Sequence, residues 1–187
     1  MCIRDSAHMI NLIFVLLFLI ILFAFYVYLR KAETLLNENT LMYATTLGFL
    51  LGIFSMTNYW DFAIYFVVTF ITLTAAFLAK GKNTWTSLLL FIGQTLMYFI
   101  PFLMDFGNPL IKLGLYVVAC ISTYLIYRLK KDSLTLAGFY LSLIFTVTHI
   151  FSLQMNLNMA EMPKSFKFVQ NNSSFYQLFI LWAFHAF

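Results

Sequence analysis

The sequence predicts an all-α fold, namely a polytopic transmembrane helical bundle with six complete spans and a truncated seventh. The 187-residue chain is 63% apolar and only 10% charged, whereas soluble domains carry about 25% charged residues. Its apolar residues form long runs, and about 20 apolar helical residues are enough to cross a hydrocarbon core of about 30 Å. Lys and Arg cluster where several of these runs end, as they do beside membrane spans. The solvent of this chain is therefore the lipid bilayer.

The N-terminal residues differ from everything that follows them. Residues 1–8 (MCIRDSAH) are polar and show no periodicity, and we interpret them as a non-native N-terminal scar. Residues 9–187 are interpreted as a single transmembrane helical domain, incomplete at its C-terminus. The first apolar run begins at Leu12 and lacks a small-residue cleavage site, so we interpret it as an uncleaved transmembrane helix and not as a signal peptide.

Hydropathy places the elements along the chain in order. The predicted spans are 10–29, 41–57, 61–79, 85–104, 109–127, 133–153 and 175 onward, and 154–174 is the only long polar connection. From Tyr176 to the last residue there are 12 residues, about 18 Å of helix at about 1.5 Å per residue, which is too short to cross. Truncation inside the seventh helix is the favoured interpretation, and a re-entrant or interfacial terminal helix is the alternative.

The distribution of basic residues predicts the orientation. The loops after spans one, three and five hold seven basic residues, whereas the opposite side holds three, Lys112, Lys164 and Lys167. Because Lys and Arg favour cytoplasmic loops, we expect a multi-pass protein of the plasma or inner membrane with its N-terminus outside. The loops of the basic side contain Arg30, Lys31, Lys80, Lys82, Arg128, Lys130 and Lys131.

Composition also limits the partners. No basic stripe interleaved with aromatic residues lies outside the spans, so nucleic-acid binding has no support. The two cysteines, Cys2 and Cys120, form no disulfide framework, zinc motif or CxxC pair. The expected partner is the lipid bilayer, and a homo-oligomer or a partner membrane subunit stays open.

Small residues at four-residue spacing mark the second span. Ala44, Gly48 and Gly52 share one helix face, and such rows let two helix backbones approach closely in lipid. We therefore interpret this row as a helix-packing face, with packing inside the monomer favoured over packing between protomers.

Spans three to six each carry polar residues in helical register, so each has one face that is unsuited to lipid. Hydroxyl stripes are commonly packing faces, a carboxylate at a helix start is commonly a cap, and two opposite charges across a turn commonly form an ion pair. The ionisable members nevertheless all fall near the predicted outer interface, where charged groups often mark a site. The candidate ligand-binding residues are Asp61, Thr69, Thr72, Gln94, Asp105, Lys112, Ser142, Thr146 and His149.

These residues support one preferred function and two alternatives. The preferred hypothesis is a bundle that binds or transports a small polar solute or ion through a cavity open to the outside, with Asp61, Asp105, Lys112 and His149 at its mouth. The first alternative is a haem-binding subunit of a membrane electron-transfer complex, with His149 and His185 as axial ligands. The second is an accessory subunit or a membrane-embedded enzyme, although the sequence indicates no catalytic residue and no metal cluster.

Overall fold

The computed structural model describes residues 3–32, 35–57, 59–80, 84–103 and 108–158. This part of the chain is all helical, and each of its six helices is long and apolar enough to cross a membrane. The prediction of a transmembrane helical bundle with six spans is therefore confirmed, whereas the predicted seventh span lies outside the described residues. The helices are α1 (Ile3–Lys31), α2 (Glu38–Thr57), α3 (Tyr59–Leu78), α4 (Trp85–Leu103), α5 (Pro109–Lys130) and α6 (Ser133–Asn158).

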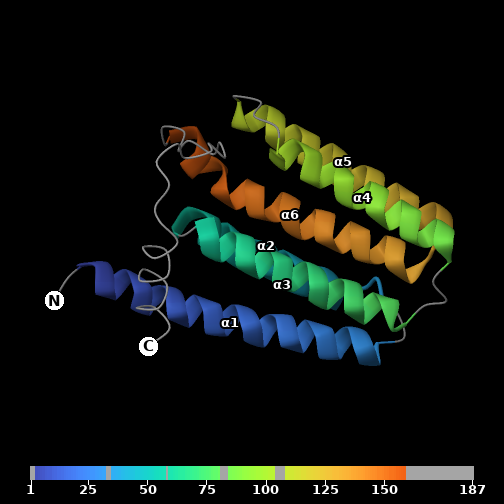
Figure 1. The fold of residues 1–187 in the computed structure, drawn as a ribbon, viewed down its shortest axis with the longest axis horizontal. Coiled ribbons are helices and arrows are strands. Elements are labelled where there is room, and N and C mark those ends of the chain that lie inside the picture. Colours follow the sequence, from blue (N-terminus) through green and yellow to red (C-terminus); the bar gives the residue numbers. More distant parts are fainter. Residues whose placement is uncertain (1–2, 33–34, 58, 81–83, 104–107, 159–187) are drawn as a thin grey trace, which may run out of the picture.

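The helices run alongside one another and alternate in direction (Figure 1). This up-and-down order follows from the short connections, because a few residues can only join neighbouring antiparallel helices. One end of the bundle therefore holds the starts of α3 and α5 and the end of α6, and we call it the Asp61 end. The opposite end holds the end of α1 and the starts of α2, α4 and α6, and we call it the Lys31 end.

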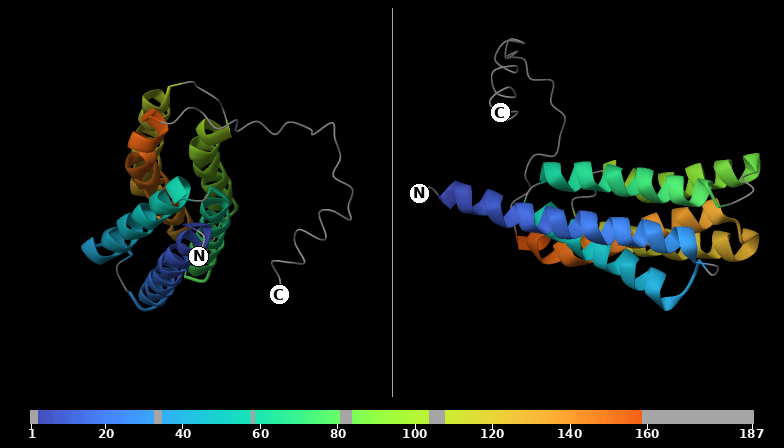
Figure 2. Two further views of the ribbon diagram at one scale, coloured as in Figure 1. Left: turned by 90° about the vertical axis from the view of Figure 1, so that its left-hand side faces the viewer. Right: turned by 90° about the horizontal axis from the view of Figure 1, so that it is seen from below.

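Helix α6 is the centre of the bundle. Its backbone adjoins those of α2, α3, α4 and α5, whereas the backbone of α1 adjoins only α2 and α3 within the described part of the chain, and α1 reaches α6 through the rings of Phe25 and Tyr140. Figure 2 shows α1 at one edge of the bundle. The outer face of α1 exposes Ile13, Ile20 and Phe23, as expected of a helix whose surroundings are lipid chains.

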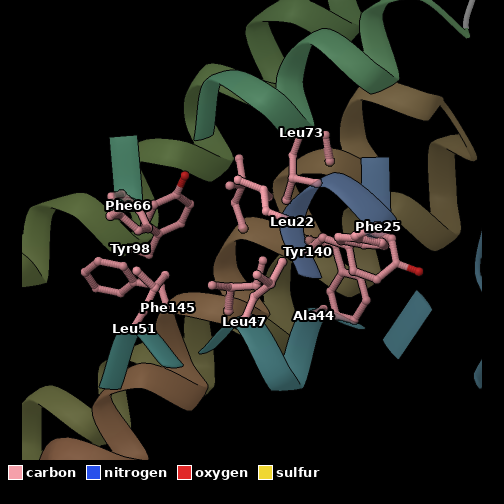
Figure 3. Close-up of a cluster of buried hydrophobic side chains, with 14 of the residues drawn as sticks. Leu22, Phe25, Ala44, Leu47, Leu51, Phe66, Leu73, Tyr98, Tyr140 and Phe145 are labelled. Atoms are coloured by element: carbon pink, nitrogen blue, oxygen red, sulfur yellow. The ribbon is translucent and has the colours of Figure 1, made fainter. Parts of the chain in front are cut away.

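Aromatic rings fill the interior on the side of α3 and α4. Phe145 of α6 lies 5.1 Å from Phe66 of α3 and 5.5 Å from Tyr98 of α4, measured between ring centroids. Figure 3 shows these three rings gathered beside Leu51, with Phe25 and Tyr140 further along the same core. Since lipid gives little hydrophobic drive between helices, close packing of this kind is a main source of their association.

Glycines bring α2 and α6 into close contact on the other side. A Cβ atom at position 48 would lie 2.8 Å from the carbonyl oxygen of Ile144, and one at position 52 would lie 3.0 Å from the Cβ of Phe151. The Thr148 hydroxyl donates a hydrogen bond to the Gly48 carbonyl oxygen at 3.1 Å. The small-residue row of α2, including the fully buried Ala44, thus faces α6 of the same chain.

Several helix boundaries differ from the predicted spans. Helix α1 begins at Ile3 and not at residue 10, α2 begins at Glu38 and not at residue 41, α5 continues to Lys130, and α6 continues to Asn158 into the stretch that we predicted as a polar connection; the other ends differ by two residues or fewer. Hydropathy marks only the part of a helix that lies in hydrocarbon, whereas backbone hydrogen bonding extends it through polar residues at the interface.

Candidate functional site

The ionisable candidates lie at the same end of the bundle. Asp61 is in the first turn of α3, Lys112 is in the first turn of α5, and His149 lies in the half of α6 that leads to the Asp61 end. All three side chains are half-buried. Asp105 and His185 lie outside the described residues, so their predicted roles stay predictions.

The His149 ring packs against one aromatic ring of its own helix and one of α5. Its ring centroid lies 4.2 Å from that of Tyr116 and 4.5 Å from that of Phe145. Its Nδ1 lies 2.8 Å from the carbonyl oxygen of Phe145. Because a carbonyl oxygen can only accept, Nδ1 carries the proton in this hydrogen bond, and the Nε2 of the neutral ring is then an acceptor.

Two buried hydroxyls on α4 and α6 make no hydrogen bond of ordinary geometry with described residues: those of Tyr98 and Ser142. The Tyr98 side chain is 1% exposed and that of Ser142 is 0% exposed. The polar neighbours are the Thr95 hydroxyl beside Tyr98 and the Cys120 thiol beside Ser142. A buried hydroxyl that makes no hydrogen bond costs about 1–3 kcal/mol, and the contacts with Thr95 and Cys120 offset part of this cost.

Gln94 joins the three helices that surround these hydroxyls. Its Nε2 donates to the carbonyl oxygen of Thr123 on α5 and to that of Thr135 on α6, each at 3.1 Å. The side chain is fully buried and its Oε1 has no partner among the described residues. Gly138 on α6 leaves the space that this amide occupies, because a Cβ there would collide with Oε1. Gln94 is therefore a structural junction as well as a candidate ligand group.

The threonines of the candidate set chiefly satisfy their own helices. The Thr146 hydroxyl donates a bifurcated hydrogen bond to the carbonyl oxygen of Ser142 at 2.8 Å and to the carbonyl oxygen of Tyr116 at 3.1 Å. Thr69 donates to the Tyr65 carbonyl oxygen at 2.8 Å, and Thr72 is half-buried. These hydroxyls remain able to accept a hydrogen bond.

Ser142, Thr146 and His149 lie on α6, and the Tyr116 ring that contacts His149 lies four residues after Lys112 on α5. Sequence reasoning omitted Tyr98 and Tyr116 from the candidate set, although both fall on polar stripes. It also missed Tyr140, whose hydroxyl contacts the connection between α1 and α2. A tyrosine in the middle of a span is the signal that could have found all three, because its hydroxyl needs a partner that lipid does not provide.

The chemistry available at this site is hydrogen bonding and charge. Within the described residues, no group of three His, Cys, Asp or Glu side chains could hold a metal ion. The site offers two hydroxyls, an imidazole nitrogen and the amide oxygen of Gln94, with a carboxylate and an ammonium group nearer to the interface. Such groups suit a small polar molecule or ion.

The fold and its buried polar groups define the class of the molecule, a polytopic integral membrane protein. A sequence model of the family described as Uncharacterized membrane protein (DUF2298) matches residues 6–187. The chain belongs to this family. No curated protein and no solved structure matches the chain.

Proposed function

We propose that this protein binds a small polar solute or ion between α4, α5 and α6 and transports it from the Asp61 end. The observation that carries the proposal is the pair of buried hydroxyls of Tyr98 and Ser142, which make no hydrogen bond of ordinary geometry among the described residues. The Tyr98 ring contacts that of Phe145, which also contacts His149, and Ser142 precedes Phe145 by three residues on α6. A polar ligand would supply the missing hydrogen bonds.

The membrane environment gives these hydroxyls their significance. Hydrocarbon holds no water to satisfy a polar group, so a buried hydroxyl in a span needs a partner within the protein or on a ligand. An apolar side chain of similar size at position 142 would serve packing alone, whereas serine buries an oxygen that makes no hydrogen bond of ordinary geometry among the described residues. Contact with a polar ligand would give this oxygen a partner.

The charged candidates support an entrance at the Asp61 end. Asp61 and Lys112 have opposite charge and both lie in a first helical turn at this end. Charged groups within or beside membrane spans often mark the pathway of a solute or ion. A solute would pass these two residues before it reaches His149 and Ser142.

A flux assay tests the proposal. The full chain is reconstituted into liposomes loaded with labelled sodium, chloride or glycerol, and efflux is compared with that from protein-free vesicles. We expect one of these probes to leave faster with the protein present. Ser142→Ala should slow that efflux about fivefold, the effect of losing one hydrogen bond of about 1 kcal/mol.

Ser55→Ala is the matched control, because the Ser55 hydroxyl on α2 already donates to the Gly52 carbonyl oxygen at 2.8 Å. Its efflux should equal that of the wild type. Measured without added solute, the free energy of unfolding of the Ser142→Ala protein should equal or exceed that of the wild type, because the change removes an unsatisfied oxygen. Efflux indistinguishable from that of protein-free vesicles for all three probes would refute transport of these solutes and with it the proposal.

The alternative functions have their own readouts. A haem-binding subunit would use His149 and His185, and a reduced-minus-oxidised absorption spectrum of the purified protein detects such a group directly. An accessory subunit would co-purify in fixed stoichiometry with a partner. We favour solute binding because the hydroxyls that make no hydrogen bond of ordinary geometry lie on α4 and α6. A ligand that contacts them would bind within this chain and would not require a partner subunit.

The proposed direction of transport rests on the charge distribution. Arg30, Lys31 and Lys80 lie at the Lys31 end together with the basic residues at the end of α5. The positive-inside rule assigns that end to the cytoplasm. We therefore propose that the Asp61 end is outside, in a plasma or inner membrane.

A further inference from the structure

A groove lies between α1 and α2 at the Lys31 end, far from the residues that carry the proposed function. Its volume is about 790 Å³. Its wall along α1 is apolar. Its rim at the Lys31 end, where α1 ends and α2 begins, is polar. The lining residues are Phe23, Ala24, Val27, Tyr28, Lys31, Ala32, Asn37 and Tyr43.

Hydrogen bonds and ring contacts fix the polar rim. The Tyr28 hydroxyl accepts a hydrogen bond from Asn37 Nδ2 at 2.8 Å, and Asn37 Oδ1 accepts from the backbone N–H of Thr40 at 2.9 Å. The Tyr43 ring stacks on Phe25 at 5.4 Å and lies 5.8 Å from the Tyr28 ring. These contacts hold Tyr28, Asn37 and Tyr43 in place at the rim.

The rim is positively charged. Lys31 lines the groove, Arg30 precedes it in the last turn of α1, and Lys80 Nζ donates to the carbonyl oxygen of Ala32. This last contact also reduces the negative partial charge that a helix C-terminus presents. Glu38, in the first turn of α2, is the described acidic residue near these three cations, and the sequence places a second acidic residue, Glu33, in the connection between α1 and α2.

The groove runs from the apolar part of α1 to the basic end of that helix. The membrane-crossing part of α1 ends at Lys31, so the apolar wall of Phe23, Ala24 and Val27 belongs to the hydrocarbon and the cations belong to the interface. Tyrosines such as Tyr28 and Tyr43 are typical of this boundary. A molecule with an anionic head and an apolar chain matches both parts.

We propose that this groove binds an anionic phospholipid, with its phosphate at Lys31 and Asn37 and one acyl chain along α1. Basic pockets between transmembrane helices bind anionic headgroups in this way. The proposal does not depend on the function proposed for α4, α5 and α6, because it concerns a different pair of helices.

Native mass spectrometry of the full chain in neutral detergent tests it. Palmitoyl-oleoyl phosphatidylglycerol and palmitoyl-oleoyl phosphatidylcholine are titrated separately, and bound lipid is counted. We expect tighter binding of phosphatidylglycerol. Lys31→Gln should weaken it about fivefold, the equivalent of about 1 kcal/mol for one basic residue at the membrane surface. Inorganic phosphate should not displace the lipid, because it lacks the acyl chain.

Two further variants separate this site from general surface charge. Lys130→Gln removes an exposed cation at the same end on α5, which makes no contact with α1, and should leave binding unchanged. Ala24→Phe fills the apolar wall and should weaken binding while Lys31 remains. Circular dichroism and size-exclusion chromatography establish that each variant is folded, and any variant that is not is replaced by Lys31→Ala or Val27→Phe.

Several results would overturn the proposal. Equal binding of both phospholipids would remove the role of charge. Equal loss in Lys31→Gln and Lys130→Gln would assign the effect to diffuse attraction, and unchanged binding in Ala24→Phe would place the lipid elsewhere. Displacement by inorganic phosphate would show an anion site without lipid specificity, and a second copy of the chain retained in place of lipid would make the groove a protein interface.

Discussion

Gly48 of α2 lies so close to Val147 of α6 that a Cβ atom at position 48 would stand 2.8 Å from the Cβ of Val147. Real Cβ atoms essentially never approach one another to that distance, and the Ile144 carbonyl oxygen is equally near. Neither group is the flexible end of a side chain. The contact between these two helices therefore depends on the absence of a side chain at position 48.

Gly48→Ala should destabilise the protein. Overpacking a close helix contact costs about 1–3 kcal/mol, and the higher helix propensity of alanine offsets at most about 1 kcal/mol of this. Gly93→Ala is the control, because a Cβ at position 93 meets nothing within 4 Å. Reversible unfolding in mixed micelles measures both. A Gly48→Ala protein as stable as Gly93→Ala would show that the contact between α2 and α6 does not require glycine at position 48.

Gly138 and Gln94 should behave as one unit. Gly138→Ala places a methyl group against the Gln94 amide and should destabilise the protein by about 1–3 kcal/mol. Gln94→Ala removes the amide that bonds Thr123 and Thr135, but it also makes room for that methyl group. The double variant should therefore be more stable than the sum of the two losses predicts, with a coupling of about 0.5–3 kcal/mol.

The control for this cycle is Gly114→Ala combined with Gln94→Ala. A Cβ at position 114 meets nothing within 4 Å, so these two changes should add within about 0.5 kcal/mol. Additive losses for Gly138 and Gln94 as well would contradict the direct contact.

Tyr140→Phe should loosen the connection between α1 and α2. The Tyr140 hydroxyl lies 2.7 Å from the Leu35 carbonyl oxygen and 2.6 Å from Thr40 Oγ1, and it joins α6 to that connection. Its removal should cost about 0.5–1.5 kcal/mol and speed amide hydrogen exchange at residues 36–40. Tyr43→Phe, on a tyrosine that packs through its ring on Phe25, should change exchange there much less. Equal exchange in the two variants would assign the stability of this connection to other contacts.

The periodicity of apolar residues was sufficient to predict the helices, because a segment in lipid must satisfy its backbone internally. The periodicity did not predict that α6 lies at the centre of the bundle or which helix faces pack together. Both features depend on close packing between particular side chains. The stripe of α6 correctly indicated a polar face, but Thr148, Tyr140 and the Gln94–Gly138 pair depend on contacts across helices. Spacing along one helix cannot show whether the Ser142 hydroxyl has a partner on another.

Leu110 and Leu129 test which end of the bundle faces outward. They lie near the two ends of α5 and are 54% and 85% exposed, so a cysteine at either position should be compatible with folding. The background is a chain in which Cys2 and Cys120 are replaced by serine. With a membrane-impermeant maleimide applied to intact cells, Leu110→Cys should react and Leu129→Cys should not, because the seven-to-three excess of basic residues assigns the Lys31 end to the cytoplasm. After permeabilisation both should react. The reverse pattern in intact cells would place the Asp61 end in the cytoplasm, and the solute would then reach His149 and Ser142 from inside the cell.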